Sequence, residues 1–203
     1  MKVKICGITN IEDAQLACEL GADAVGFIFY EKSKRFVENQ KVKSIISMLP
    51  SSVEKVGVFV NEPPENINRI SKEISLTVAQ LHGNESPDFL TEINLPIWKA
   101  LRVKEDFDFT LTNNFMNCKI MLDAYSQNEF GGTGKTFNWN IIPDSLKSEI
   151  ILAGGISSFN IEEIYKNIKP AWVDISSSLE IQPGKKDKIK LEDFFNKVNI
   201  LRK

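Results

Sequence analysis

The chain has few of the residues that build disulfide frameworks and metal sites. It contains 3 Cys and 1 His in 203 residues, and Cys6, Cys18 and Cys118 form no C-x-x-C pair. An odd number of cysteines without such a pair argues against a disulfide framework and against a zinc site. We therefore expect reduced thiols.

Long apolar runs and an excess of one charge are also missing. The first residues, MKVKICGIT, contain no apolar segment of the kind found in a signal peptide, and no apolar run approaches the ~18 residues of a membrane span. With 25 Lys and Arg against 27 Asp and Glu and a pI near 5.6, the chain offers no broad basic surface to nucleic acid or to an anionic membrane. We expect a cytoplasmic protein whose partner is a small molecule, with no nucleic-acid or membrane partner.

Short apolar segments and helical segments alternate along the chain. Eight segments have the apolar, β-branched composition of strands: Val3–Cys6, Ala24–Phe29, Lys55–Val60, Thr77–Gln80, Ile97–Leu101, Lys119–Asp123, Ile150–Ala153 and Trp172–Asp174. Between several of them, apolar residues recur with helical spacing, in Ile11–Leu20, Val42–Leu49, Ile67–Ile74, Phe159–Ile168 and Leu191–Leu201. The strand ends are 20 to 31 residues apart, which is typical of βα units.

The number of βα units predicts the fold class. Eight units over residues 1–203 fit a single-domain α/β protein, a (β/α)₈ TIM barrel with short helices. A doubly wound open sheet is the alternative, but no strand is followed by a G-x-G-x-x-G fingerprint. Cys6, Gln80, Asp123 and Asp174 end predicted strands, and only a barrel would bring them to one mouth. We expect the segment 107–115, rich in Thr and Asn, to be a loop or a single turn.

Two strand-terminal residues are candidates for acid and base chemistry. Period-two alternation puts Lys4 on the same face as Cys6, where an ammonium group would favour the thiolate. Asp123 follows an apolar strand, and partial desolvation there would raise its pKa and keep some of it protonated as a general acid. Cys6 could instead be a buried structural residue, and Asp123 could cap the following loop. Their pairing across one mouth favours catalysis.

Glycine and serine residues follow the last two strands. Gly154 and Gly155 follow the seventh strand, and Ser176 and Ser177 follow the eighth. In many barrels these two loops hold a phosphate group through backbone N–H groups and hydroxyls, although ordinary turns would also use these residue types.

Three further features have less certain roles. The glycine-dense segment 131–135 could be a lid or a ligand-binding loop, or a plain connection, but it lacks the Walker A spacing. Arg35 could grip a carboxylate through two N–H groups, or belong to a solvated charge cluster. His82, more often structural when it is the only histidine, is expected to line the mouth without performing the central proton transfer.

Taken together, six segments in order closely resemble phosphoribosylanthranilate isomerase of tryptophan biosynthesis. They are Lys4–Thr9, Gln80–Gly83, Leu122–Ala124, Gly131–Lys135 with Phe137 and Trp139, Leu152–Ile156, and Asp174–Glu180. The resemblance extends from residue 4 to about Asp187, nearly the whole chain. It implies a monomeric or dimeric barrel that converts N-(5-phosphoribosyl)anthranilate to 1-(o-carboxyphenylamino)-1-deoxyribulose 5-phosphate by an Amadori rearrangement, with no cofactor and no metal.

The resemblance also implies roles for individual residues. Asp123 matches the general acid that protonates the furanose oxygen, and Cys6 matches the base that removes the C2 proton. Arg35 matches an arginine near the anthranilate carboxylate. Four residues match the phosphate loops: Gly154, Gly155, Ser176 and Ser177. Asp174 matches a carboxylate on the substrate side, and its role stays open.

Two positions depart from the family pattern. Ser178 replaces a usual glycine. The serine would cost about 1 kcal/mol of stability if that position demands a positive φ, and otherwise its hydroxyl could add a phosphate contact. Lys34 stands where a proline is common. The alternatives are another phosphosugar barrel enzyme, either indole-glycerol-phosphate synthase or the aldosylamine isomerase of histidine biosynthesis, and a phosphate-ligand binder without catalytic activity. The first-strand Cys6 argues against the histidine-pathway enzyme, which has an aspartate there.

Overall fold

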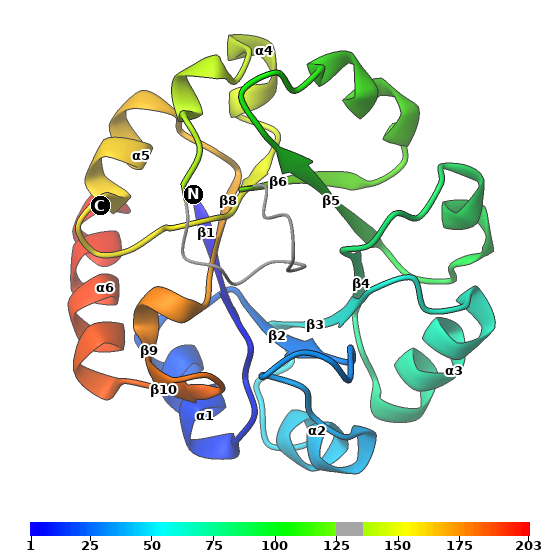
Figure 1. Cartoon of the computed structure of the whole chain (residues 1–203). Helices are drawn as coiled ribbons and strands as arrows, with labels where there is room; N and C mark the ends of the chain where they lie inside the picture. The colour runs from blue at the N-terminus through cyan, green and yellow to red at the C-terminus, as the bar shows by residue number, and fades with distance from the viewer. Residues whose placement is uncertain (125–135) are drawn as a thin grey trace.

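A closed barrel of eight parallel strands forms the centre of the molecule (Figure 1). The computed structural model describes residues 1–124 and 136–203. The strands, in barrel order, are β1 (Lys2–Cys6), β2 (Ala24–Ile28), β3 (Glu54–Phe59), β4 (Val78–Leu81), β5 (Ile97–Val103), β6 (Lys119–Ala124), β7 (Ile151–Leu152) and β8 (Trp172–Ile175). The barrel closes where β1 pairs with β8, in a register that sets Lys4 beside Asp174. The predicted TIM barrel is confirmed, and an open sheet is excluded.

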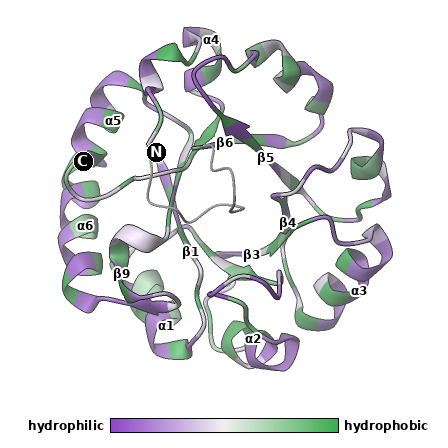
Figure 2. Ribbon diagram, in the orientation of Figure 1, coloured by the Kyte–Doolittle hydropathy of each residue, from purple (hydrophilic) through white to green (hydrophobic). Residues whose placement is uncertain are grey.

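Helices surround the strands, as Figure 1 shows. The α-helices are α1 (Ile11–Leu20), α2 (Asn39–Ile46), α3 (Pro64–Ile74), α4 (Asp144–Lys147), α5 (Ile161–Asn167) and α6 (Lys188–Leu201). Short 3₁₀ helices are η1 (Asp88–Glu92), η2 (Phe109–Phe115), η3 (Trp139–Ile141) and η4 (Ser177–Leu179), and a hairpin is formed by β9 (Glu180–Gln182) and β10 (Lys185–Lys186). Hydrophilic and hydrophobic residues alternate around these helices in Figure 2, as expected when one face packs on the barrel. Within the described ranges, none of the helices has both the length and the apolarity needed to cross a bilayer.

Local signals explain where α1 begins and ends. The side chain of Asn10 accepts a hydrogen bond from Asp13 N at 2.8 Å, and Gly21 ends the helix with φ +109°. The segment 107–115 differs from the prediction, because η2 spans seven residues and is longer than a single turn. Its Thr and Asn residues disfavour an α-helix, and the segment forms a 3₁₀ helix instead.

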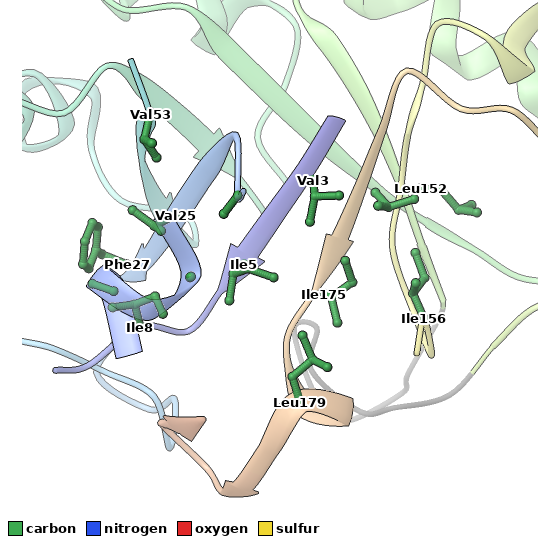
Figure 3. Packing of buried hydrophobic residues seen from close by; sticks show 14 of the residues in the cluster. Val3, Ile5, Ile8, Val25, Phe27, Val53, Leu152, Ile156, Ile175 and Leu179 are labelled. Carbon is green, nitrogen blue, oxygen red and sulfur yellow. The ribbon is translucent and has the colours of Figure 1, made fainter. Parts of the chain in front are cut away.

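Strand alternation divides the interior into two cores. Side chains that point away from the barrel axis, including Val3, Ile5 and Phe27, pack beneath the helices (Figure 3). Side chains that point inward form a second cluster, in which the rings of Trp98 and Trp172 meet edge to face with centroids 4.9 Å apart. This apolar cluster lies inside the barrel, and the carboxyl ends of the strands, where the polar residues near the ends of β1, β6 and β8 lie, are here called the mouth.

Candidate active site

A cavity opens at the mouth of the barrel. Its lining includes all the residues that the sequence singled out for the site: Cys6, Arg35, His82, Asp123, Gly154, Gly155, Asp174, Ser176 and Ser177. Residues separated by as much as 171 positions therefore face one space. Polar groups that converge on one concavity, with apolar side chains between them, are typical of a small-molecule site.

The thiol of Cys6 lies at the end of β1 and is 6% exposed. Gly26 of β2 pairs with it, and a Cβ at that position would come within 3.0 Å of Cys6 Sγ and 2.7 Å of Lys4 Cε. A glycine is therefore required for the thiol and the Lys4 side chain to lie together. Burial raises the pKa of Cys6, and the opposing effect of Lys4 does not compensate. Lys4 thus acts on the thiol in the direction expected from the sequence, lowering its pKa, but burial has the larger effect.

Lys4 extends into the barrel interior and is fully buried. Its Nζ lies 3.0 Å from Asp174 Oδ1 and donates a hydrogen bond to Gln80 Oε1 at 2.7 Å. Burial lowers the pKa of Lys4, but Asp174 and Cys6 raise it above its ordinary value. The site therefore holds a buried ammonium whose charge is balanced by Asp174.

The carboxyl group of Asp123 lies at the end of β6 and is held from three sides. Its Oδ1 accepts a hydrogen bond from Ala124 N at 2.8 Å, and its Oδ2 lies 3.2 Å from His82 Nε2. The loop after β7 closes the third side, because a Cβ on Gly154 would lie 3.0 Å from Asp123 Oδ1 and 2.8 Å from Ala124 N. His82 lines the mouth as expected, and its direct contact with Asp123 was not predicted.

The loops after β7 and β8 form one end of the lining. Gly154 and Gly155 have φ values of +86° and +65°, which glycine adopts readily. The hydroxyl of Ser176 is buried and has no hydrogen-bond partner in residues 1–124 and 136–203. A buried hydroxyl costs free energy unless something accepts or donates to it, so Ser176 is poised for a ligand.

Ser178 adopts a conformation that carries no glycine-like strain. Among the described residues, the non-glycine positions with positive φ are Asn61, Ser75 and Lys169. The Ser178 hydroxyl donates to Ile156 O at 2.5 Å and so ties the loop after β8 to the loop after β7. The backbone strain that a serine could have caused here is therefore absent, and its hydroxyl links the two loops.

Arg35 is held by an ion pair that sequence reasoning missed. Its Nε and Nη2 donate to the carboxylate of Glu180 at 2.9 Å and 2.7 Å, so it does not belong to a solvated charge cluster. Burial raises the pKa of Glu180, but Arg35 and Lys186 together lower it by more, so that its pKa is below the ordinary value. Lys186 Nζ also donates to Cys6 O at 2.6 Å and thereby ties the hairpin to the end of β1. Glu180 belongs to a segment that carries the family resemblance, but nothing in the sequence pointed to its partners.

Two predicted features need separate mention. The segment 131–135, predicted as a lid or ligand loop, lies outside the described residues. Phe137 and Trp139, which follow it, pack against the outer core. Within the described residues no group of three or more His, Cys, Asp and Glu side chains is arranged to hold a metal ion.

Known proteins of similar sequence and fold give a consistent result. The family described as N-(5′-phosphoribosyl)anthranilate (PRA) isomerase matches residues 3–197. A curated relative, the N-(5′-phosphoribosyl)anthranilate isomerase of Pelobacter propionicus, is 44% identical over 195 residues, which are 96% of this chain and 93% of that protein. The crystal structure of phosphoribosyl anthranilate isomerase from Thermotoga maritima superposes with a TM-score of 0.90 and 37% identity over 98% of each chain. A further crystal structure of such an isomerase, in complex with reduced 1-(o-carboxyphenylamino)-1-deoxyribulose 5-phosphate, has a TM-score of 0.87 and 35% identity over 98% of each chain.

Proposed function

The chain belongs to the phosphoribosylanthranilate isomerase family, and from that premise we propose that it converts N-(5-phosphoribosyl)anthranilate to 1-(o-carboxyphenylamino)-1-deoxyribulose 5-phosphate, with Asp123 as general acid and Cys6 as general base. The observation that carries the proposal is the shared cavity, in which a carboxyl group and a thiol from different strands face one space. Beside them lies the buried hydroxyl of Ser176, which has no hydrogen-bond partner among the described residues. The reaction is an isomerisation, so every proton removed is returned and no external oxidant or reductant enters.

The first step opens the furanose ring. Asp123 gives its proton to the ring oxygen, the bond between C1 and that oxygen breaks, and the anthranilate nitrogen forms a C=N bond to C1. Negative charge develops on the Asp123 carboxylate, whose oxygens would accept hydrogen bonds from Ala124 N and His82 Nε2. Hydrogen bonds to a charged acceptor are stronger than those to a neutral one, so these contacts strengthen as the proton leaves.

The second step removes the proton from C2. The positive nitrogen of the C=N group makes this proton acidic, and the thiolate of Cys6 takes it while a C1=C2 double bond forms. The nearby Lys4 ammonium lowers the pKa of Cys6 against the larger effect of burial, and so supports the thiolate that the step needs. The resulting enolamine then gains a proton at C1 and loses one from the C2 hydroxyl to give the ketone.

Phosphate and carboxylate groups of the substrate have complementary partners in the cavity. The backbone of Gly154 and Gly155 and the hydroxyls of Ser176 and Ser177 would hold the phosphate, as in other barrels of this class. Arg35 would face the anthranilate carboxylate, to which its planar guanidinium group is suited. Because Glu180 already binds two of its N–H groups, Arg35 is held in one orientation before substrate arrives.

Purified protein tests the proposal directly. Incubation with N-(5-phosphoribosyl)anthranilate should abolish the fluorescence of its anthranilate group, and the isolated product should contain a ketone and have the mass of the substrate. Tight binding without turnover would indicate a phosphate-ligand binder, and turnover restricted to the histidine-pathway aldosylamine would indicate the other isomerase. Restoring growth to a tryptophan auxotroph that lacks this step would extend the result to the cell. Sedimentation velocity decides between the monomer and the dimer that the family resemblance allows.

A further inference from the structure

A chain of buried polar side chains crosses the barrel from Lys4 to Asp123. Lys4 Nζ donates to Gln80 Oε1 at 2.7 Å, Gln80 Nε2 lies 2.9 Å from His82 Nδ1, and His82 Nε2 lies 3.2 Å from Asp123 Oδ2. All four residues are buried. Given the role proposed above for Asp123, we propose that Lys4 and Gln80 are positioning residues that hold His82 as its neutral Nε2–H tautomer, so that it donates to Asp123 when the ring opens.

The orientation of the Gln80 amide follows from its neighbours. An ammonium group has donors and no acceptor, so the group that faces Lys4 must be the carbonyl oxygen. Gln80 Nε2 then faces His82 Nδ1 and, at 3.4 Å, Met121 Sδ, both of which can accept. Reversing the amide would set its N–H groups against the ammonium of Lys4, which has no acceptor to offer them. One orientation therefore satisfies every group.

The orientation of the amide decides which nitrogen of His82 carries the proton. Because Gln80 Nε2 donates, His82 Nδ1 must accept and can bear no proton. The ring proton is then on Nε2, which faces Asp123 Oδ2. A doubly protonated ring would bring two N–H groups together at Nδ1. Lys4 is linked to Asp123 by three successive hydrogen bonds, and its charge thus determines that His82 Nε2–H is the donor facing Asp123.

The consequence for the reaction lies in the charge that develops on Asp123. As the acid gives up its proton, a fixed N–H donor at 3.2 Å stabilises the carboxylate without any rearrangement. The opposite tautomer would present a lone pair to the same oxygen and repel the developing charge. Gln80 and Lys4 act through His82, and neither needs to touch the ring oxygen of the substrate.

The single histidine of the chain makes the tautomer directly measurable. In ¹⁵N-labelled protein without an affinity tag, long-range ¹H–¹⁵N correlation spectra distinguish the protonated ring nitrogen from the unprotonated one. We expect Nε2 to be protonated in the wild type. In Gln80→Glu both side-chain oxygens accept, so the proton should move to Nδ1. Gln40→Glu on α2, where the residue is exposed and does not line the cavity, makes the same change of charge and should leave the spectrum unchanged.

Kinetic measurements on the same proteins complete the test. Gln80→Glu should lower kcat about ten- to a hundredfold, the range for one hydrogen bond to a charged group, with a smaller change in KM. His82→Gln, which can return a donor toward Asp123, should retain more activity than His82→Leu. If Gln80→Glu does not fold, Gln80→Met should give a mixture of tautomers. Wild type with Nδ1 protonated, a Gln80→Glu spectrum unchanged from wild type, or a moved proton with unchanged kcat would each overturn the proposal. Full activity in Asp123→Asn would instead refute the proposed acid and leave the tautomer result standing.

Discussion

Replacing Gly154 with alanine tests whether the loop after β7 fixes the position of Asp123. Gly154 has φ +86°, and an added Cβ would lie 2.8 Å from Ala124 N and 3.0 Å from Asp123 Oδ1. A non-bonded contact of this kind is comfortable at about 3.5 Å, so either β6 or the loop must move by several tenths of an ångström. The nearest atom belongs to the backbone, which cannot move aside as the end of a side chain could.

The expected effect on stability follows from the backbone conformation. A non-glycine residue in the left-handed region costs about 1–2 kcal/mol, which in a domain of this size corresponds to a fall in Tm of roughly 2–8 °C. Gly21→Ala is the matched control, because Gly21 also has a positive φ, +109°, but its nearest contacts are side-chain atoms at 3.7 Å, from Arg202 and Asn199. Both variants should lose stability, and thermal unfolding followed by circular dichroism measures the loss.

The expected effect on catalysis separates the two variants. A misplacement of 1 Å in a catalytic group costs about a hundredfold in rate, so a shift of half that size in Asp123 should lower kcat about tenfold. Gly21→Ala should keep the kcat of the wild type, because Gly21 precedes β2, at the end of the strands opposite the mouth, and does not line the cavity. Steady-state fluorescence gives kcat and KM for both. A Gly154→Ala enzyme with reduced Tm and wild-type kcat would refute the inference that this loop positions the acid.

Three further predictions concern the thiol, the free hydroxyl and the arginine. Burial raises the pKa of Cys6 above its ordinary 9.0 and that of Cys118 to about 11, so each thiolate forms only at higher pH. The pH dependence of alkylation by iodoacetamide, followed by peptide mass mapping, should therefore show a midpoint above 9 for Cys6 and near 11 for Cys118. A Cys6 midpoint below 9 would show that the effect of Lys4 exceeds that of burial. Ser176→Ala should raise KM about tenfold with little change in Tm, since its hydroxyl has no partner among the described residues; unchanged KM would exclude a phosphate contact. Arg35→Lys should raise KM about tenfold, because the ammonium cannot form the two-pronged contact, and it should also lower Tm through Glu180; an unchanged KM would exclude a substrate contact.

Much of the fold was predictable because period and spacing are local signals. The segment Ile11–Leu20 was predicted as a helix and is α1, since Asn10 and Gly21 mark its ends in the sequence. The strand predicted over residues 150–153 is observed as β7, which is only two residues long. Helix α4, of four residues, is too short to show a period and was not predicted.

The site was predictable to the level of which residues meet, and less so in how they interact. Strand ends in a barrel converge, so Cys6 and Asp123 could be placed at one mouth from their positions alone. The charge state of Cys6 could not be predicted, because the pKa of its thiol depends on how far burial outweighs the effect of Lys4, which only the three-dimensional structure shows. The pairing of Arg35 with Glu180, 145 residues away, likewise has no signature in either local segment.

The central claim is that Cys6 and Asp123 carry the two proton transfers of the isomerisation. The most direct test is the turnover of N-(5-phosphoribosyl)anthranilate, followed by fluorescence, in wild type, Cys6→Ser and Asp123→Asn under substrate saturation. The account predicts turnover in the wild type and a loss of kcat of about 10²–10⁴-fold in each variant, the usual contribution of a general acid or base, with the fold intact by circular dichroism. Wild-type kcat in folded Cys6→Ser or Asp123→Asn would contradict it.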